Sequence, residues 1–222
     1  MNNNMYNAIK HHLSDNILLG YSSGSLPEAF SLMVASHISL CSTCRAQLES
    51  FDAIGGEVLN SSVETDTPMA SDSLNATLAL IREGPTHKPV PSRIDDRVLP
   101  KPIQDYVGGG LADIKWRAIG MGVKQAILPT SDAASARLLF IPAGAAIPDH
   151  GHQGLELTMV LQGAFKDEDD YFARGDIEMA DSEMHHTPIA DINEDCICLV
   201  VSDARLKFDG LIPKIMQRFA QM

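Results

Sequence analysis

The sequence is poor in basic residues. It holds 17 Lys and Arg against 29 Asp and Glu, which gives a formal net charge of −12 and a pI near 4.9. Nucleic-acid binding depends on clustered Lys and Arg side chains that neutralise phosphates and release counterions. The composition therefore argues against direct binding to nucleic acid.

Long apolar runs are also missing. No stretch approaches the roughly 18 uninterrupted apolar residues of a membrane-spanning helix, and the Asn-rich start MNNNMYNAIK has no apolar signal-peptide core. We therefore predict a cytoplasmic protein that does not bind membranes. Apolar residues still make up 45% of the 222, and this length fits two modest domains.

Cysteines are few, and they occur in two closely spaced pairs. The pairs are Cys41-x2-Cys44 and Cys196-x-Cys198. In a reducing compartment, such spacings indicate metal or redox chemistry more than structural disulfides. Cys196 and Cys198 would share one face of a strand, either as a redox pair or as core residues. Core packing fits better, because neighbouring strand positions rarely meet disulfide geometry.

A proline-rich stretch divides the chain. Residues 84–102 contain five prolines among charged residues, which predicts an extended linker over residues 85–103. It separates a helical domain, residues 1–84, from a β domain, residues 104–222. We therefore predict an α + β protein with two domains.

The predicted helices of the first domain are short. One follows a cap at Ser14 or Asp15, a second begins at the capping box Ser25-Leu26-Pro27-Glu28, and two more cover residues 45–54 and 74–81. A domain of about 80 residues with such helices has a small core. A bound metal ion would therefore contribute much of its folding free energy.

Metal-binding side chains gather in HISLCSTC, residues 37–44. His37 and Cys41 are four residues apart and share one helix face, and Cys44 lies about one turn further. Zinc takes nitrogen and thiolate ligands at about 2.0–2.3 Å, and a closed structural site needs four. The fourth ligand is His11 or His12, and His12 is preferred because it lies nearer the next helix. The predicted structural zinc site is His12, His37, Cys41 and Cys44.

The stretch HLSDNILLGYSSGSLPEAFSLMVASHISLCSTCR, residues 12–45, resembles the zinc-binding anti-sigma domains of bacteria. The shared order is a His, a short helix, a Gly-containing turn, a helix started by Pro, and HxxxCxxC. The resemblance implies a helical domain that wraps an extracytoplasmic-function-type sigma factor and blocks its access to RNA polymerase. The acidic charge would steer the protein toward the basic surfaces of such a factor.

The second half has the pattern of an antiparallel β-sandwich or barrel. Short β-type runs separated by Gly, Pro, Asn and Asp cover residues 113–128, 136–141, 155–160, 177–179 and 196–202. In His150-x-His152, both imidazoles face the same side of an extended segment and can share one ion. Glu156 adds an oxygen ligand, and a histidine from a later strand would complete a site of three imidazoles and one carboxylate.

This pattern resembles the cupin family over residues 104–208. The first cupin motif is present as His150, His152, Glu156 and Gly163. The second motif begins at Gly175 and places its histidine eleven residues on, which selects His186 over His185. His185 stays open as the alternative, because Asp181-Ser182-Glu183 replaces the Pro-x-Gly of many cupins. Zinc is the first choice of ion, and iron, manganese, nickel and copper also suit this ligand set.

Both halves together resemble the ChrR family of anti-sigma factors. The resemblance implies that the N-terminal domain alone binds the sigma factor, and that the cupin-like domain is needed to release it under reactive-oxygen, usually photo-oxidative, stress. We expect an oxidant or modified lipid in the cupin pocket to alter the metal ligands there, and the linker or domain interface to transmit the change.

Two other functions compete with this prediction. One is a metal-dependent cupin enzyme, a dioxygenase or isomerase, with a regulatory zinc domain attached. The other is a metal buffer. A zinc ion with four protein ligands leaves no position for substrate, so we predict a regulator and no enzyme. The C-terminal FDGLIPKIMQRFAQM predicts a short amphipathic helix that covers the barrel or meets another chain, as in a homodimer.

Overall fold

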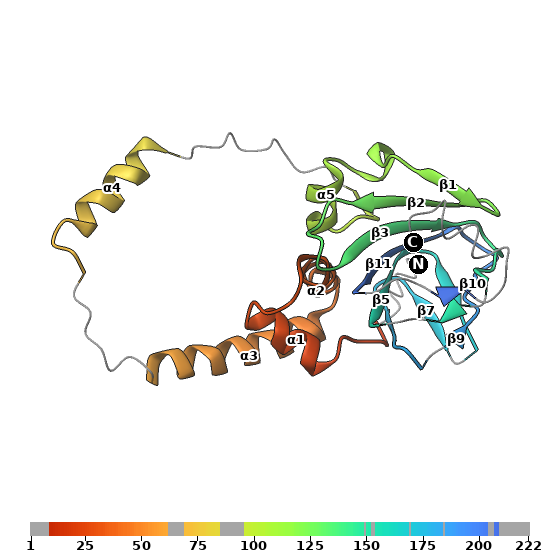
Figure 1. Cartoon of the computed structure of the whole chain (residues 1–222), viewed down its shortest axis with the longest axis horizontal. Coiled ribbons are helices and arrows are strands. Elements are labelled where there is room, and N and C mark those ends of the chain that lie inside the picture. Colours follow the sequence, from red (N-terminus) through yellow and green to blue (C-terminus); the bar gives the residue numbers. More distant parts are fainter. Residues whose placement is uncertain are drawn as a thin grey trace, which may run out of the picture.

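The structure is a computed structural model of the whole chain. It describes residues 9–61, 69–84, 96–148, 150–151, 154–168, 170–183, 185–203 and 207–208, and at positions 150, 151, 207 and 208 it describes the backbone alone. The predicted C-terminal helix lies outside these residues. Helices of the N-terminal half lie beside an antiparallel β domain (Figure 1), which confirms the predicted α + β class.

Helices form the first half of the chain. They are α1 (Asp15–Ser22), α2 (Glu28–Leu40), α3 (Ser42–Ser61), α4 (Ser73–Glu83), α5 (Lys101–Val107) and the 3-10 turn η1 (Leu111–Asp113). The four predicted helices are present, and α3 is longer than predicted, with 20 residues. No helix among the described residues is long and apolar enough to cross a membrane.

The predicted capping box at the start of α2 is wrong. Pro27 occupies the N-cap position and no side chain caps the helix. Ser25 Oγ donates instead to the Gly20 carbonyl at 3.2 Å. The Glu28 carboxylate accepts from Tyr106 Oη at 2.6 Å and from the Ser131 backbone N–H at 2.7 Å. The Glu28 carboxylate, which was expected to cap the helix, therefore bonds to the second half of the chain instead. Local sequence does not reveal these contacts.

Among the residues described in the second half, every strand pairing is antiparallel. The strands are β1 (Arg117–Gly120), β2 (Val123–Leu128), β3 (Ser135–Ile141), β4 (His150–Gly151), β5 (Glu156–Gln162), β6 (Ala164–Lys166), β7 (Tyr171–Ala173), β8 (Ile177–Ala180), β9 (His185–His186), β10 (Ile189–Ala190), β11 (Cys196–Ser202) and β12 (Lys207–Phe208). The main sheet has the order β1-β2-β3-β11-β5-β8, and the smaller sheets are β10-β6-β7 and β12-β4-β9.

The main sheet has two buried faces. β11 lies inside it, and all seven of its residues are buried. Because strand side chains alternate, Leu199 and Val201 join one apolar cluster while Cys198 and Val200 join another. The first cluster includes the helices, and the second includes Phe165 and other residues of the smaller sheet. The sheet therefore separates a helical layer from the interior of the β domain.

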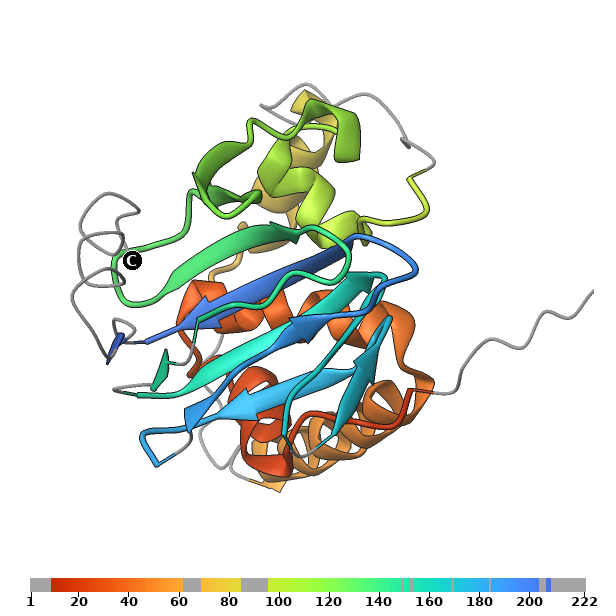
Figure 2. The same ribbon diagram turned by 90° about the vertical axis from the view of Figure 1, so that its right-hand side faces the viewer.

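Helix α2 connects the two halves. It contacts α1, α3 and α5 as well as β3, β5 and β11, and the helices lie behind the sheet in Figure 2. Phe30, Met33 and Val34 on α2 are almost fully buried, as are Leu157 and Met159 on β5. Burying such a side chain stabilises the fold by about 1.5–3 kcal/mol. The helical half and the sheet thus share one hydrophobic core.

The end of the predicted linker is packed rather than extended. Leu99 and Ile103 are 1% and 0% exposed, and α5 begins at Lys101 with a proline in its first turn. A proline is compatible with the first turn of a helix, where its missing N–H is not needed. Pro100 and Pro102 therefore mark the start of a helix, although they were counted among the prolines that predicted an extended linker. Residues 85–95 lie outside the described part.

Helix α4 contrasts with the other helices. None of its residues is buried, and Figure 1 shows it apart from the rest of the protein. Three apolar side chains, Leu74, Leu78 and Ile81, recur at a spacing of four and three and so form one stripe. Leu74 and Ile81 are 67% and 68% exposed. The helix therefore presents an apolar face to solvent.

Candidate metal centres

The four residues of the predicted zinc site come together in the structure. The ligand atoms of His12, His37, Cys41 and Cys44 all lie within 4.8 Å of one another. His37 is in the last turn of α2, Cys41 ends that helix in an extended conformation, and Cys44 is in the first turn of α3. His12 comes from the segment before α1. The break between two helices thus gathers three ligands, and the preceding segment adds the fourth.

The distances within this cluster suit a tetrahedral ion. Nε2 of His37 lies 3.2 Å from Cys44 Sγ, and Nδ1 of His12 lies 3.3 Å from Cys41 Sγ and 3.6 Å from Cys44 Sγ. Ligand bonds of about 2.0–2.3 Å at tetrahedral angles place neighbouring ligand atoms about 3.3–3.8 Å apart. The backbone N–H of Cys44 also donates to Cys41 Sγ at 3.4 Å.

Burial gives these ligands opposite proton preferences. Burial lowers the pKa of His37 to about 4, against the opposing effect of the Gly175 carbonyl. Its ring is therefore neutral at pH 7, with a nitrogen available for a metal. Burial raises the pKa of Cys44 to about 11, so its thiolate is unfavourable until a cation binds. Metal binding here would release a proton from a thiol.

The structure also distinguishes the two candidate histidines. His12 joins the cluster, whereas His11 faces the β domain. Nε2 of His11 lies 2.9 Å from an Asp170 carboxylate oxygen, and its ring packs against Phe172 with centroids 4.4 Å apart. The choice of His12 over His11 therefore agrees with the geometry.

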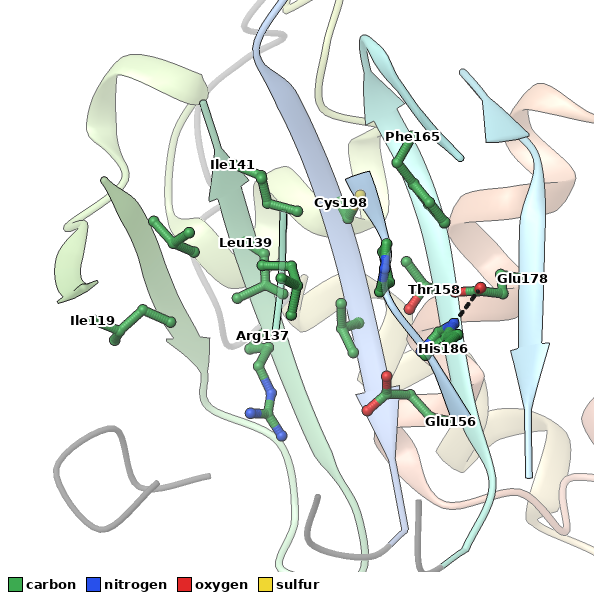
Figure 3. Close-up of a pocket in the computed structure, with 14 residues that line it drawn as sticks. Ile119, Arg137, Leu139, Ile141, Glu156, Thr158, Phe165, Glu178, His186 and Cys198 are labelled. Atoms are coloured by element: carbon green, nitrogen blue, oxygen red, sulfur yellow. Dashed lines mark hydrogen bonds and ion pairs between the residues drawn. The ribbon is translucent and has the colours of Figure 1, made fainter. Parts of the chain in front are cut away.

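The second predicted centre is described in part. Glu156 and His186 both line a cavity of about 60 Å³ between the sheets, and their side chains point into the same space in Figure 3. His186 is buried on β9 while His185 is exposed, so the motif spacing selected the inward residue. The backbone of His150 pairs in register with His186. The side chain of His150 and all of His152 lie outside the described residues.

The first-motif glycine has a structural reason. Gly163 has a φ of +67°, and a Cβ there would meet the Asp195 carbonyl oxygen at 2.7 Å. A residue with a side chain would be disfavoured both by this conformation and by this contact. Gly163 therefore shapes the turn between β5 and β6, which carry Glu156 and Phe165 of the cavity.

Glu156 carries a strongly perturbed carboxyl group. It is 5% exposed, and burial raises its pKa to about 7, although the nearby Arg137 guanidinium opposes the shift. A buried carboxylate needs positive charge close by. A divalent cation in the cavity would provide such charge. The ligand atoms that lie within 4.8 Å of one another here are those of Asp167, Glu178 and His186, while Glu156 lines the same cavity.

Sequence reasoning missed the carboxylates around His186. Nδ1 of His186 lies 2.9 Å from Glu178 Oε1 and 3.8 Å from Asp167 Oδ2. Burial lowers the pKa of His186, but these carboxylates and Glu156 outweigh it, and the net pKa is raised. A histidine that binds a metal commonly directs its other ring nitrogen at a carboxylate, as Nδ1 of His186 is directed at Glu178. The missed signal was a charged residue inside an apolar strand, as Glu178 is in IEMA.

The second cysteine pair is part of the core. Cys196 and Cys198 are 0% and 1% exposed, and their sulfurs lie 3.5 Å apart, well beyond the roughly 2.05 Å of a disulfide. Contact with Cys196, together with burial, raises the pKa of Cys198 well above its usual value. Both are buried thiols in the arrangement that core packing predicts.

Comparisons with known proteins cover both halves of the chain. A family model described as the ChrR cupin-like domain matches residues 107–205. The anti-sigma-E factor ChrR of Cereibacter sphaeroides is 51% identical over 211 residues, which are 95% of this chain and 98% of that protein.

A solved structure shows the same relationship. A chain in the crystal structure of Rhodobacter sphaeroides SigE in complex with the anti-sigma ChrR matches at 48% identity and a TM-score of 0.75, over 87% of this chain and 99% of that chain. Because the similarity includes the helical half as well as the barrel, it favours a regulator over a cupin enzyme. The chain belongs to the ChrR family of anti-sigma factors.

Proposed function

We propose that this protein is a cytoplasmic anti-sigma factor that sequesters an extracytoplasmic-function-type sigma factor through its N-terminal domain, residues 1–84. The observation that carries the proposal is the exposed apolar stripe of α4. An isolated helix of 11 residues is marginal in water, and exposed leucines gain no burial energy. A partner that covers Leu74, Leu78 and Ile81 would supply both the packing and the burial.

The second half of α3 supports the same surface. Ile54, Val58 and Leu59 are 61%, 59% and 70% exposed on it. Exposed apolar residues gathered on consecutive helices indicate an interaction site rather than scattered surface residues. The net charge of −12 suits a partner with basic surfaces for DNA and polymerase, because complementary charge speeds association.

The proposed role of the N-terminal centre is structural. Zn²⁺ held by His12, His37, Cys41 and Cys44 would join the segment before α1 to the corner between α2 and α3. With four protein ligands, it would have no open position for a substrate. The ion would therefore fix the base from which α3 and α4 reach the sigma factor.

The proposed role of the cupin-like domain is the response to reactive oxygen species. Its ion, Zn²⁺ or another divalent transition metal, would be held by His150, His152, Glu156 and His186, and it would supply positive charge to the buried carboxylate. An oxidant or modified lipid that reaches this cavity would alter the ligand set. The shared core around α2 would then carry the change to the helical half.

The proposed sigma-binding surface can be tested by replacing its apolar side chains with charged ones. Leu78→Glu and Ile81→Glu place a carboxylate in the apolar stripe of α4, and each should weaken the complex of the full chain with its sigma factor by at least tenfold in Kd, about 1.4 kcal/mol. Ala76→Glu is the matched control, because it adds the same charge on the opposite face of the helix. Equal affinity of all three variants and the wild type would reject α4 as the contact.

The stress response is tested separately at Glu156. Glu156→Ala should leave repression of the sigma factor intact and reduce its release, read as sigma-dependent transcription before and during photo-oxidative stress. The exposed Glu194→Ala serves as the control. A Glu156→Ala strain that induces transcription as strongly as the wild type would contradict the proposed role of the cupin site.

A further inference from the structure

The segment that carries His12 is held by the cupin-like domain. We define residues 9–12 as the N-terminal strap. These residues lie before α1, outside any helix or strand, so no regular secondary structure fixes the backbone of His12. The other three ligands of the cluster sit at the corner between α2 and α3. The position of His12 therefore depends on what the strap touches.

Asp176 makes the central contact with the strap. Its Oδ1 accepts hydrogen bonds from the backbone N–H groups of Lys10 at 2.6 Å and His11 at 3.0 Å. Its Oδ2 accepts from the Ala173 backbone N–H at 2.9 Å and so closes the turn between β7 and β8. Asp176 is 3% exposed. One buried carboxylate thus bonds at once to its own turn and to a segment 165 residues away in the sequence.

Neighbouring contacts hold the strap in the same place. The Ile177 backbone N–H donates to the His11 carbonyl at 3.2 Å. The strap therefore also bonds to the first residue of β8. Gly175 has a φ of +90°, and a Cβ there would lie 2.6 Å from Cδ1 of Ile9. The strap therefore lies directly against this turn, and the absence of a side chain at Gly175 permits the approach.

The last residue of the strap is itself a ligand of the cluster. His12 follows directly after His11, whose backbone N–H is bonded to Asp176. Groups outside the ligand set that orient ligands tune metal affinity as well as geometry.

We infer that Asp176 is a positioning residue of the N-terminal metal centre. By fixing the strap from the cupin-like domain, it sets the place of His12 relative to Cys41 and Cys44. Two residues further along the chain, Glu178 on β8 contacts His186 of the cupin cavity. The turn before β8 thus contacts the strap, and β8 itself contacts His186 in the cavity.

Cobalt in place of zinc provides the measurement. In the full chain without a sigma factor, the thiolate-to-cobalt absorption reports the site of Cys41 and Cys44 alone, because the cupin ligands contain no sulfur. Asp176→Ala and Lys10→Pro each remove hydrogen bonds to the strap. Both should raise the rate of cobalt loss to a chelator about tenfold, within the range for lost orienting groups.

Lys10→Ala is the matched control, because it removes the side chain and keeps the backbone N–H. It should lose cobalt at the wild-type rate. If Asp176→Ala disturbs its own turn and fails to fold, Lys10→Pro decides the question, since it leaves the cupin-like domain unchanged. Equal rates for Lys10→Pro, Lys10→Ala and the wild type would overturn the inference. The measurement needs no sigma factor, so its outcome is independent of sigma binding.

Discussion

The two candidate metal centres differ in how they are assembled and in what surrounds them. The N-terminal centre gathers two imidazoles and two thiols, with three of the four ligands inside an eight-residue segment. The cupin centre places Glu156 and His186 in a cavity with two further carboxylates, Glu178 and Asp167, beside the imidazole. The first arrangement suits a closed structural site. The second, with a cavity and perturbed carboxyl groups, suits a site that responds to what enters it.

The largest expected difference between the two centres is in how proton binding changes the stability of the metal-free protein. In the metal-free protein, Glu156 has a pKa of about 7 when folded against 4.5 when unfolded. The folded state therefore binds more protons between these pH values, and the free energy of unfolding falls as pH rises through them. His37, lowered to about 4 from 6.5, has the opposite effect, because there the unfolded state binds more protons.

Glu156→Gln tests this difference. At about 1.36 kcal/mol per pKa unit, the shift corresponds to about 3 kcal/mol. The stability of the chelated wild type relative to the chelated variant should therefore fall by about this amount from roughly pH 5 to pH 8, as measured by denaturant unfolding. Glu194→Gln, at an exposed position, is the control. A wild-type curve parallel to that of Glu156→Gln would show that the buried carboxyl does not titrate in this range.

A smaller effect is expected at Glu178, and it should be confined to the cupin centre. Glu178→Ala removes the acceptor for Nδ1 of His186 and should weaken zinc binding in the cavity about tenfold. Glu178→Gln keeps an acceptor oxygen and should recover most of the affinity. The cobalt–thiolate absorption of the N-terminal centre should be unchanged in both. Loss of that absorption in Glu178→Ala would mean that the two centres are not separable as described.

Local spacing accounts for what could be predicted from the sequence. His37, Cys41 and Cys44 are neighbours along the chain, so they come together although the predicted continuous helix face is wrong. The helix breaks at Cys41, and the corner between α2 and α3 gathers the three side chains. The eleven-residue spacing from Gly175 likewise selected His186, and alternation on β9 faces it inward. Both sets of residues carry their geometry within a short segment.

Tertiary contacts account for what could not be predicted. The position of His11 depends on Asp170 and Phe172, more than 150 residues away in the sequence. The Glu28 carboxylate, expected at a helix cap, bonds to Tyr106 and Ser131. The partners of His186 depend on which carboxylates the folded sheets bury. Local propensity does not reveal these contacts. The sequence indicated them only through a charged residue inside an apolar strand, Glu178.

The most direct test of the account is metal removal from the complex. The full chain is purified with its sigma factor, the zinc content is measured, and the complex is treated with a chelator strong enough to remove the ion bound by Cys41 and Cys44. The account predicts zinc at the N-terminal centre and dissociation of the sigma factor as that zinc is lost, with recovery when zinc is restored. A complex that stays intact, at unchanged affinity, after the N-terminal centre has been emptied would contradict it.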